Sequence, residues 1–386
     1  MIPGPVEISP AVLEAHASPP PGHLSPRVIE AFGASLERMR GVWRSGPSGQ
    51  PFVVAGSGTT AMEMAAANLV GPGDPVVVVH TGYFSDRMAE MLRRTGAEVR
   101  SVTSGPGEAP GDDEVRDAME ALLREGKKPR ALFATHVDTS TGVRIDPRPL
   151  AHLARTYGAL AVFDGVCATG GERFEMEAWG ADVYVTASQK AIGLPPGLAL
   201  MVVSERALAA RSARKQPPPM VLDWHEWLPI MRAYEERRPA YFATPATNLI
   251  LALDVGLREI LEDGIDARIV SHERTGRAMR AAWSAMGLAP VPAREDLQAN
   301  TLSALRYPAG AGPSLVARIA ERGVVVAGGL HPEIKDRYFR VGHMGYAVTR
   351  TDMLVRTVEA IEAGLLGEGA RVESGAGAKA VRSALV

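Results

Sequence analysis

The sequence contains little cysteine and no excess of charge of either sign. Its single cysteine, Cys167, excludes an intrachain disulfide and any metal site built from several cysteines. The 42 basic residues balance 44 acidic ones, which argues against nucleic acid as the main partner. No apolar run reaches the roughly 18–20 residues of a membrane span, and the first residues lack the pattern of a signal peptide. We therefore expect a cytoplasmic protein without a membrane or nucleic-acid partner.

Lysine is also scarce, because only six of the basic residues are lysine and the other 36 are arginine. Arginine stays protonated in proteins, whereas lysine can become a neutral amine nucleophile. Five lysines lie in polar segments, but Lys190 lies between two apolar strand patterns in VYVTASQKAIGLPPGLALMVV. Burial at that place would disfavour the charged amine. The plain alternative is a lysine at a strand end whose amine reaches solvent.

The pattern over residues 52–205 predicts an α/β fold. Seven short, nearly continuous apolar runs alternate with helical stretches (FVVAG, PVVVVH, EVRSV, ALFATHV, ALAVFDG, DVYVTA and LALMVV). Strands that are apolar throughout are typical of a mostly parallel sheet covered by helices on both faces.

Composition divides the chain into four predicted segments. Residues 1–25 are rich in proline and predict an extended arm, and 26–254 form the large domain with the parallel sheet. Residues 255–365 combine two long helical patterns with short strands and predict a smaller α+β domain. The Gly-, Ala- and Ser-rich residues 366–386 are expected to be a disordered tail.

Two motifs in the large domain follow predicted strands. Asp164 ends the run ALAVFD, at the carboxyl edge where open α/β sheets bind ligands. In GSGTTAMEM, a glycine turn with hydroxyls leads into an apolar helix, whose free N–H groups can bind an anion. Each motif alone also fits a plain structural role, namely a capping aspartate and an ordinary strand–turn–helix junction.

Two further motifs carry polar groups in apolar surroundings. THVDTSTG, residues 135–142, places several hydroxyls after a strand, where they can orient a ligand or form a capped turn. Arg340 lies in the strand-like YFRVGH of the second domain and needs an anion partner, either a substrate carboxylate or an internal salt bridge. Together, an anion cradle, an aspartate, a lysine and an arginine suit pyridoxal 5′-phosphate chemistry, which needs a phosphate site, a partner for the pyridine nitrogen, an amine and a carboxylate clamp.

The chain also resembles a known family on motifs that run from Pro3 to about residue 365. These are the initial PGP, SGT at 57–59, GYFSDR at 82–87, THVDTSTG, FDGVCATGG, SQK at 188–190, YFATP at 241–245 and FRVGHMG. They resemble class V aminotransferases of pyridoxal-phosphate fold type I, in the alanine–glyoxylate and serine–pyruvate branch. The resemblance implies a mostly parallel sheet between helices, with a smaller carboxyl-terminal α+β domain. It also implies amino transfer from alanine or serine to glyoxylate or pyruvate by a ping-pong mechanism.

The resemblance implies roles for individual residues around the cofactor. Lys190 would bind the cofactor aldehyde and then move the proton at the substrate Cα, and Asp164 would pair with the pyridine nitrogen. Val166 and Phe84 would contact the two ring faces, although many relatives carry tryptophan where Phe84 stands. Thr139 would donate its hydroxyl near the ring oxygen.

The phosphate and the substrate have their own implied ligands. Ser57, Gly58, Thr59 and Gln189 would bind the phosphate, and Arg340 would bind the substrate carboxylate. Tyr241 and Thr244 match positions that reach the phosphate from the other subunit, which implies a homodimer with shared sites. His23 and His343 match the family pattern without an assigned catalytic role.

Other activities on the same fold stay open at this point. Many relatives have serines where Cys167 and Ala168 stand, so hydrogen bonding near Asp164 differs. A lyase or a cysteine desulfurase is the closest alternative. The desulfurase would need a nucleophilic cysteine on a mobile loop, and Cys167 instead lies three residues after Asp164. A 2-aminoethylphosphonate-type aminotransferase and a non-catalytic binding protein are the remaining alternatives.

Overall fold

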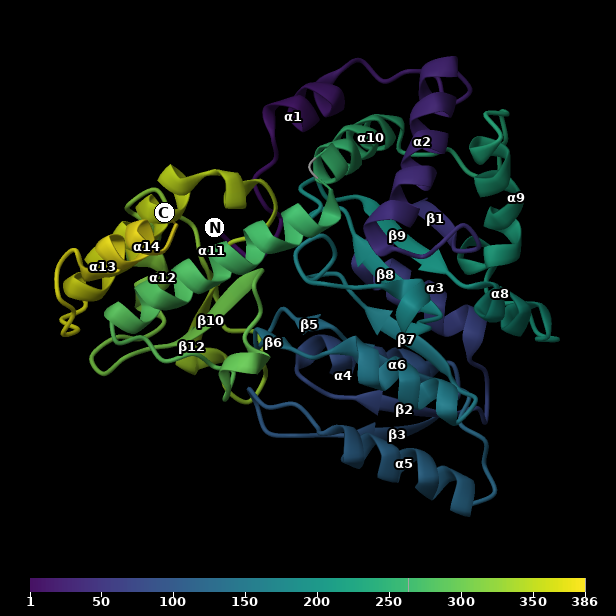
Figure 1. Ribbon diagram of the computed structural model, residues 1–386, viewed down its shortest axis with the longest axis horizontal. Helices are drawn as coiled ribbons and strands as arrows, with labels where there is room; N and C mark the ends of the chain where they lie inside the picture. The colour runs from purple at the N-terminus through teal and green to yellow at the C-terminus, as the bar shows by residue number, and fades with distance from the viewer. Residues whose placement is uncertain (263, 386) are drawn as a thin grey trace.

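The computed structural model describes residues 1–262 and 264–385 and has two lobes (Figure 1). The large lobe is built on a seven-stranded sheet of order β1-β9-β8-β7-β4-β2-β3. Its strands are β1 (Gln50–Ala55), β2 (Pro75–Val79), β3 (Glu98–Val102), β4 (Ala131–Thr135), β7 (Leu160–Asp164), β8 (Val183–Ala187) and β9 (Leu198–Val203). β9 alone runs in the opposite direction to the other six strands, so the predicted mostly parallel sheet is confirmed.

Helices cover this sheet, and its strands are almost fully buried except for the edge strand β3. The helices of the large lobe are α2 (Pro26–Trp43), α3 (Gly58–Leu69), α4 (Tyr83–Arg94), α5 (Asp112–Arg124), α6 (Pro147–Thr156), α7 (Met176–Trp179), α8 (Glu205–Ser212), α9 (Trp224–Glu235) and α10 (Thr247–Glu262). One continuous hydrophobic core joins them to the sheet. At about 25 cal/mol per Å² of buried apolar surface, such packing is the main stabilising contribution in a fold of this kind.

The small lobe has its own sheet and its own core. Its elements are α11 (Ile265–Ala285), β10 (Leu302–Arg306), α12 (Ser314–Ala320), β11 (Ala327–Gly328), β12 (Tyr338–Gly342), α13 (Thr351–Gly367) and α14 (Ala376–Leu385), with sheet order β10-β12-β11. A second hydrophobic cluster lies among these helices and strands. The domain boundary at 254/255 stays a prediction, and it falls within α10, whose buried residues pack on the large core.

The amino-terminal arm contains a helix, which differs from the extended arm predicted for residues 1–25. Helix α1 (Pro10–Ala17) begins after Ser9, whose hydroxyl accepts a hydrogen bond from Val12 N at 3.2 Å. Proline at the first helical position suits a helix start. Val12 is buried and α1 packs against α10, so tertiary contact stabilises a short helix that the proline-rich composition does not suggest.

The carboxyl-terminal segment also differs from the prediction, because residues 376–385 of the expected disordered tail form α14. The Glu362 carboxylate of α13 accepts hydrogen bonds from Gly375 N at 2.5 Å and Gly377 N at 3.3 Å, at the start of α14. Val381 is fully buried, and α14 packs along α11 and α13. Small residues allow this close packing, since a Cβ on Gly377 would meet Met286 and Val358 at 2.8 Å.

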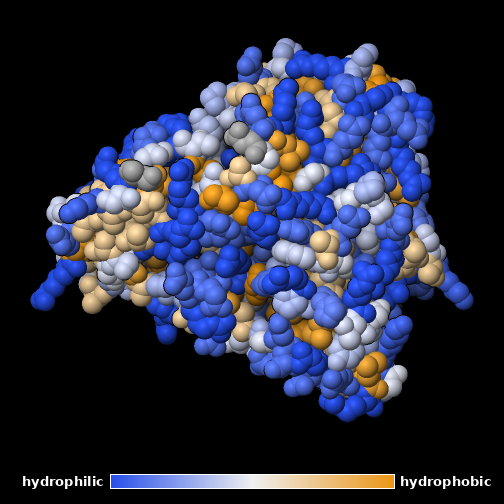
Figure 2. All heavy atoms as spheres, viewed as in Figure 1, coloured by the Kyte–Doolittle hydropathy of each residue, from blue (hydrophilic) through white to orange (hydrophobic). Residues whose placement is uncertain are grey.

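The outer surface is mostly hydrophilic on the face shown in Figure 2, where hydrophobic side chains form small separate groups. Among residues 1–262 and 264–385, no helix combines the length and the apolar character needed to cross a membrane.

Candidate active site

The candidate site lies at the carboxyl ends of neighbouring strands of the large sheet. β4, β7 and β8 are parallel neighbours, so the segments that follow them meet at one edge. Asp164 is the last residue of β7, the Thr139 turn follows β4 and the Lys190 loop follows β8. This is the edge at which open α/β sheets bind ligands, and it brings together motifs that are far apart in the sequence.

Lys190 has a buried side chain, with 9% of the residue exposed. Its Nζ donates a hydrogen bond to the carbonyl of Pro3 in the amino-terminal arm. Burial lowers the pKa of the Lys190 amine, and the charge of Arg340 lowers it further, while Cys167 and Asp164 oppose the shift. The arm passes very close to the side chain, because a Cβ on Gly4 would lie 2.5 Å from Lys190 Cδ. The structure therefore makes the neutral amine easier to form here than on an exposed lysine.

Asp164 is 3% exposed, and its Oδ1 accepts a hydrogen bond from Val166 N at 2.9 Å. Burial raises the pKa of the Asp164 carboxyl to about 7, and the nearby Asp138 charge adds to this rise. The bond from Val166 and the charges of Lys190 and Arg87 act in the opposite direction. A carboxyl poised in this way can accept or share a proton near neutral pH.

The predicted strand–turn–helix junction is present at the start of α3, where the anion cradle is expected. The Ser57 hydroxyl accepts a hydrogen bond from Thr60 N at 3.3 Å, and Ser57 N donates to Thr60 Oγ1 at 3.1 Å. Gly58 lies directly against the Asp164 loop, since a Cβ there would meet Val166 at 2.8 Å. The helix dipole and free N–H groups at this end attract negative charge.

The turn after β4 is tied to the start of α4 by Asp138, a buried residue that the sequence interpretation did not single out. Asp138 Oδ1 accepts from Ser140 N at 3.0 Å, and Oδ2 accepts from Phe84 N at 3.1 Å and Ser85 N at 3.3 Å. These bonds hold Thr139 and Phe84 next to each other. The available signal in the sequence was a carboxylate among the hydroxyls of THVDTSTG, directly after a buried strand.

Arg340 comes from β12 of the small lobe and reaches the same turn. Its Nε donates to Gly328 O at 2.8 Å and its Nη1 donates to Thr139 O at 3.1 Å. Burial lowers the pKa of its guanidinium, with the Tyr338, Cys167 and Asp138 groups opposing this. Among residues 1–262 and 264–385, no carboxylate forms an ion pair with Arg340. A guanidinium held by backbone carbonyls alone can still donate hydrogen bonds to the carboxylate of a ligand.

Two predicted residues, Tyr241 and Thr244, are exposed, whereas Lys190 and Asp164 are buried. Tyr241 is 60% exposed and its hydroxyl lies 3.4 Å from Thr244 Oγ1, also on the surface. The ring of His23 lies 5.4 Å from the Tyr241 ring. These three residues therefore form a surface group of their own.

Cys167 and His343 are both buried. Cys167 is 1% exposed and burial raises the pKa of its thiol, with the Lys190 charge opposing this. His343 Nε2 lies 3.0 Å from Ser303 Oγ, and burial lowers the pKa of its imidazole to about 3. Both residues pack within the structure, as expected of residues without a direct chemical role.

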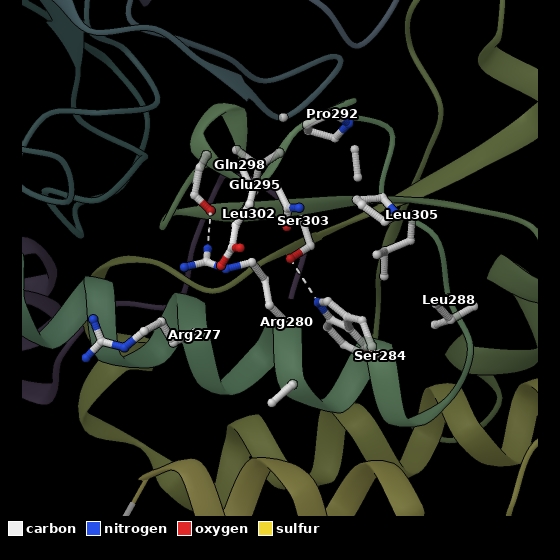
Figure 3. Close-up of a pocket in the computed structure, with 16 residues that line it drawn as sticks. Arg277, Arg280, Ser284, Leu288, Pro292, Glu295, Gln298, Leu302, Ser303 and Leu305 are labelled. Atoms are coloured by element: carbon white, nitrogen blue, oxygen red, sulfur yellow. Dashed lines mark hydrogen bonds between the residues drawn. The ribbon is translucent and has the colours of Figure 1, made fainter.

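A cavity of about 520 Å³ lies elsewhere, between α11 and β10 (Figure 3). Arg280 lines it and donates to Ala299 O at 3.3 Å, and Trp283 Nε1 donates to Ser303 Oγ at 2.9 Å. None of the residues lining it is a predicted site residue. It holds no lysine–carboxylate pair, so we place the chemistry at the sheet edge and not in this cavity.

The fold and the grouped lysine, aspartate and arginine define an enzyme that handles amines and carboxylates. A family model described as aminotransferase class-V matches residues 43–330. The chain belongs to the class V aminotransferases and is a pyridoxal-phosphate-dependent aminotransferase.

Named relatives cover nearly the whole chain. Alanine–glyoxylate aminotransferase 1 of Saccharomyces cerevisiae is 37% identical over 89% of this chain and 91% of its own length. L-Aspartate–glyoxylate aminotransferase of Paracoccus denitrificans is 31% identical over 99% and 94%. The crystal structure of ureidoglycine–glyoxylate aminotransferase from Bacillus subtilis superposes with a TM-score of 0.91 at 25% identity, covering 100% and 97% of the two chains.

The residues present fit the cofactor that the family implies. The Gly58 backbone forms a cradle that a Cβ would fill, directly against Val166. The buried Oε1 of Gln189 has no hydrogen-bond partner among the described residues, which leaves this side chain free to turn toward a ligand. The donor set also matches, because it combines an amine, a carboxyl group and a helix start with free N–H groups.

Proposed function

We propose that the protein moves an amino group from a small amino acid, alanine or serine, to glyoxylate or pyruvate in a ping-pong cycle. One observation carries this proposal, namely the buried Lys190 amine whose surroundings include Asp164 of the large lobe and Arg340 of the small lobe. The relatives support the acceptor, since the names of all three include glyoxylate. Their donors differ, so the donor is the part of the proposal that most needs a test.

The cofactor, when bound, supplies an aldehyde that combines with amines and a ring that withdraws electrons from the bond to the substrate Cα. Lys190 then has two tasks, which are to bind the aldehyde and to move the proton at the substrate Cα. Both need the neutral amine, which burial favours. Arginine could not take over this role because it does not lose its proton.

Asp164 would hold a proton at the ring nitrogen. The pKa of about 7 applies to the Asp164 carboxyl with no cation beside it. A protonated ring nitrogen next to the carboxyl would lower this pKa and favour the ionised carboxylate. Val166 and Phe84 would contact the two faces of the ring, and Thr139 would donate its hydroxyl near the ring oxygen. Ser57, Gly58, Thr59 and Gln189 would bind the phosphate.

Arg340 would orient the substrate by binding its carboxylate. The guanidinium already donates to two backbone carbonyls, which fixes its position before a substrate arrives. Its remaining N–H groups can form charge-assisted hydrogen bonds to a carboxylate. A guanidinium fixed in this way would orient the substrate carboxylate with little further ordering of its own side chain.

We also propose a homodimer in which Tyr241 and Thr244 complete the partner's phosphate site. The support is their exposure in the single chain, in contrast to the buried Lys190 and Asp164. An exposed tyrosine beside an exposed threonine contributes little to this chain's own stability, and a partner surface would give both a function.

A desulfurase is the less suitable alternative on this fold. The thiol that it would need is buried, and burial raises its pKa, which disfavours the reactive thiolate. A 2-aminoethylphosphonate aminotransferase differs from our proposal in the donor, and the experiment below separates the two.

The experiment is a screen of half-reactions. The purified protein loaded with pyridoxal phosphate is mixed with single amino donors, and the visible absorbance of the bound cofactor is followed. We expect alanine or serine to bleach the absorbance fastest, and glyoxylate or pyruvate to restore it. Faster bleaching by 2-aminoethylphosphonate or release of sulfide from cysteine would reassign the enzyme. No change with any donor would indicate a binding protein.

A further inference from the structure

Arg87 of α4 is absent from the predicted site residues but contacts two of them. Its Nη1 donates to Thr59 Oγ1 at 3.0 Å, in the turn that starts α3. Its Nη2 donates to Tyr83 OH at 2.8 Å. The guanidinium carbon lies 5.3 Å from the centre of the Phe84 ring and 4.8 Å from that of Tyr83. One side chain therefore joins the anion cradle to the aromatic residue expected to stack on the cofactor ring.

Among residues 1–262 and 264–385, Arg87 forms no ion pair, although its charge opposes the rise that burial causes in the pKa of the Asp164 carboxyl. The predicted phosphate ligands Ser57, Gly58, Thr59, Gln189, Tyr241 and Thr244 are all neutral. A phosphate monoester carries about two negative charges at neutral pH, so neutral ligands alone leave most of that charge to the helix dipole.

The position of Arg87 follows from helix geometry. Phe84 and Arg87 are three residues apart on α4, so their side chains lie on the same face. The start of α4 is in turn fixed by Asp138, which accepts a hydrogen bond from Phe84 N at 3.1 Å. The guanidinium is therefore held from several directions, and its planar fork gives one nitrogen to each hydroxyl.

We propose that Arg87 positions Thr59 and Phe84 for the cofactor and supplies the positive charge that the neutral phosphate cradle lacks. This inference rests on the proposed cofactor site. The motif GYFSDR would then supply two functional residues, Phe84 and Arg87. Arg87 would have two separable roles, because its charge would act on the phosphate and its contact with Phe84 would act on the cofactor ring.

The test compares two ligands that differ only in the phosphate. Cofactor-free protein is titrated with pyridoxal 5′-phosphate and with pyridoxal, and both dissociation constants are measured by absorbance. We expect Arg87→Gln to weaken pyridoxal phosphate roughly 10- to 100-fold, the range of one hydrogen bond to a charged group. Pyridoxal should change less than about 3-fold.

Two further variants control the measurement. Arg87→Lys keeps the charge and loses the fork, so its affinity for pyridoxal phosphate should lie between wild type and Arg87→Gln. Arg93→Gln changes an arginine on the exposed side of the same helix, 3.4 Å from Ser101 Oγ, and should leave both constants unchanged. If Arg87→Gln fails to fold, the test uses Arg87→Lys, and compares its loss of affinity for pyridoxal phosphate with its loss of affinity for pyridoxal.

Equal losses for both ligands would overturn the charge role, as would unchanged affinity for pyridoxal phosphate. The proposed cofactor site fails in a different way. In that case wild-type protein binds neither ligand, or binds pyridoxal phosphate equally well after Lys190→Ala. The two failures are therefore distinguishable from the same titrations.

Discussion

At the scale of single residues, burial shifts the base and the acid of this site in opposite directions. The pKa of Lys190 falls and that of Asp164 rises to about 7, because loss of water disfavours the charged form of each. Both residues are therefore biased toward neutrality before a ligand is bound. An aldehyde brought to Lys190 would use the bias of the amine, and a ring nitrogen brought to Asp164 could take up the proton that the carboxyl holds.

Replacing Lys190 tests whether its amine or merely its charge is needed. We expect Lys190→Arg and Lys190→Ala to lower kcat by roughly 10³-fold or more, since neither side chain can bind an aldehyde or move a proton. Steady-state assays with alanine and glyoxylate measure this. A Lys190→Arg enzyme with more than a tenth of wild-type kcat would contradict the assignment.

Asp164 should make the stability of the cofactor-free protein depend on pH. The unfolded carboxyl loses its proton near about pH 4, whereas the folded carboxyl keeps it up to about pH 7. Asp164 therefore lowers stability progressively as pH rises from about 4 to about 7. The buried His136, His272 and His343, whose pKa values burial lowers to about 3, act in the opposite direction, so the test is a difference between two proteins. In urea unfolding, wild type should lose stability relative to Asp164→Asn across this range.

The control for that experiment is Asp113→Asn, because Asp113 is an exposed aspartate at the start of α5. It should leave the pH profile unchanged. A wild-type profile that already matches Asp164→Asn would show that folding does not raise the pKa of this carboxyl.

At the scale of elements, the site depends on how α4 begins. Two N–H groups at the start of α4 are satisfied by Asp138 from the turn after β4, and not by a side chain of α4 itself. One buried carboxylate thus fixes a helix start and a turn relative to each other. Phe84, Arg87 and Thr139 take their positions from this contact.

Removing that carboxylate should loosen both elements. We expect Asp138→Ala to lower the free energy of unfolding by about 2 kcal/mol or more, the cost of losing a cap and several buried hydrogen bonds. It should also weaken cofactor retention. Glu90→Gln on the exposed face of α4 removes only a surface ion pair with Arg94 and should change stability by less than about 0.5 kcal/mol. Equal stabilities in urea titrations would contradict this account.

At the scale of the whole molecule, the site needs both lobes and, on our proposal, a second subunit. Arg340 reaches the Thr139 turn from the small lobe, and the amino-terminal arm contacts Lys190. Tyr241 and Thr244 remain on the surface of the chain. Substrate selection should therefore depend on contacts between parts of the molecule as much as on the sheet edge.

Mixing two inactive variants tests the shared site. In a heterodimer of Lys190→Ala and Tyr241→Ala chains, a shared arrangement places both defects in one site and leaves the other intact. We expect mixtures refolded or exchanged together to recover up to about a quarter of wild-type activity, since half of the dimers would be mixed. Each variant alone serves as the control, and absence of recovery in a proven heterodimer would contradict sharing.

The sequence predicted the large sheet well because its signals are local. All seven apolar runs form strands, and the alternation with helices implies parallel order. The tail helix α14 and the arm helix α1 were missed because their stability comes from contacts with α11, α13 and α10. Segments rich in glycine, alanine or proline give little local signal for such docking.

The same division applies to the site. Lys190, Asp164 and the start of α3 could be identified from their strand context, because a polar group at the end of a buried strand is conspicuous. Asp138 and Arg87 could not, since a carboxylate among hydroxyls and an arginine on an amphipathic helix look ordinary until their partners are known. Their importance comes from neighbours that are distant in sequence.

The sequence by itself determined the class of this protein, its parallel sheet and the lysine that can bind an aldehyde, because these depend on residue type and short-range pattern. Only the tertiary structure decided the protonation tendencies of Lys190 and Asp164 and the contact of Arg340 with the Thr139 turn. Only the tertiary structure also shows that Arg87 contacts both the Thr59 hydroxyl of the cradle and the Phe84 ring. Burial and hydrogen bonding act through space, so residues far apart along the chain set them together.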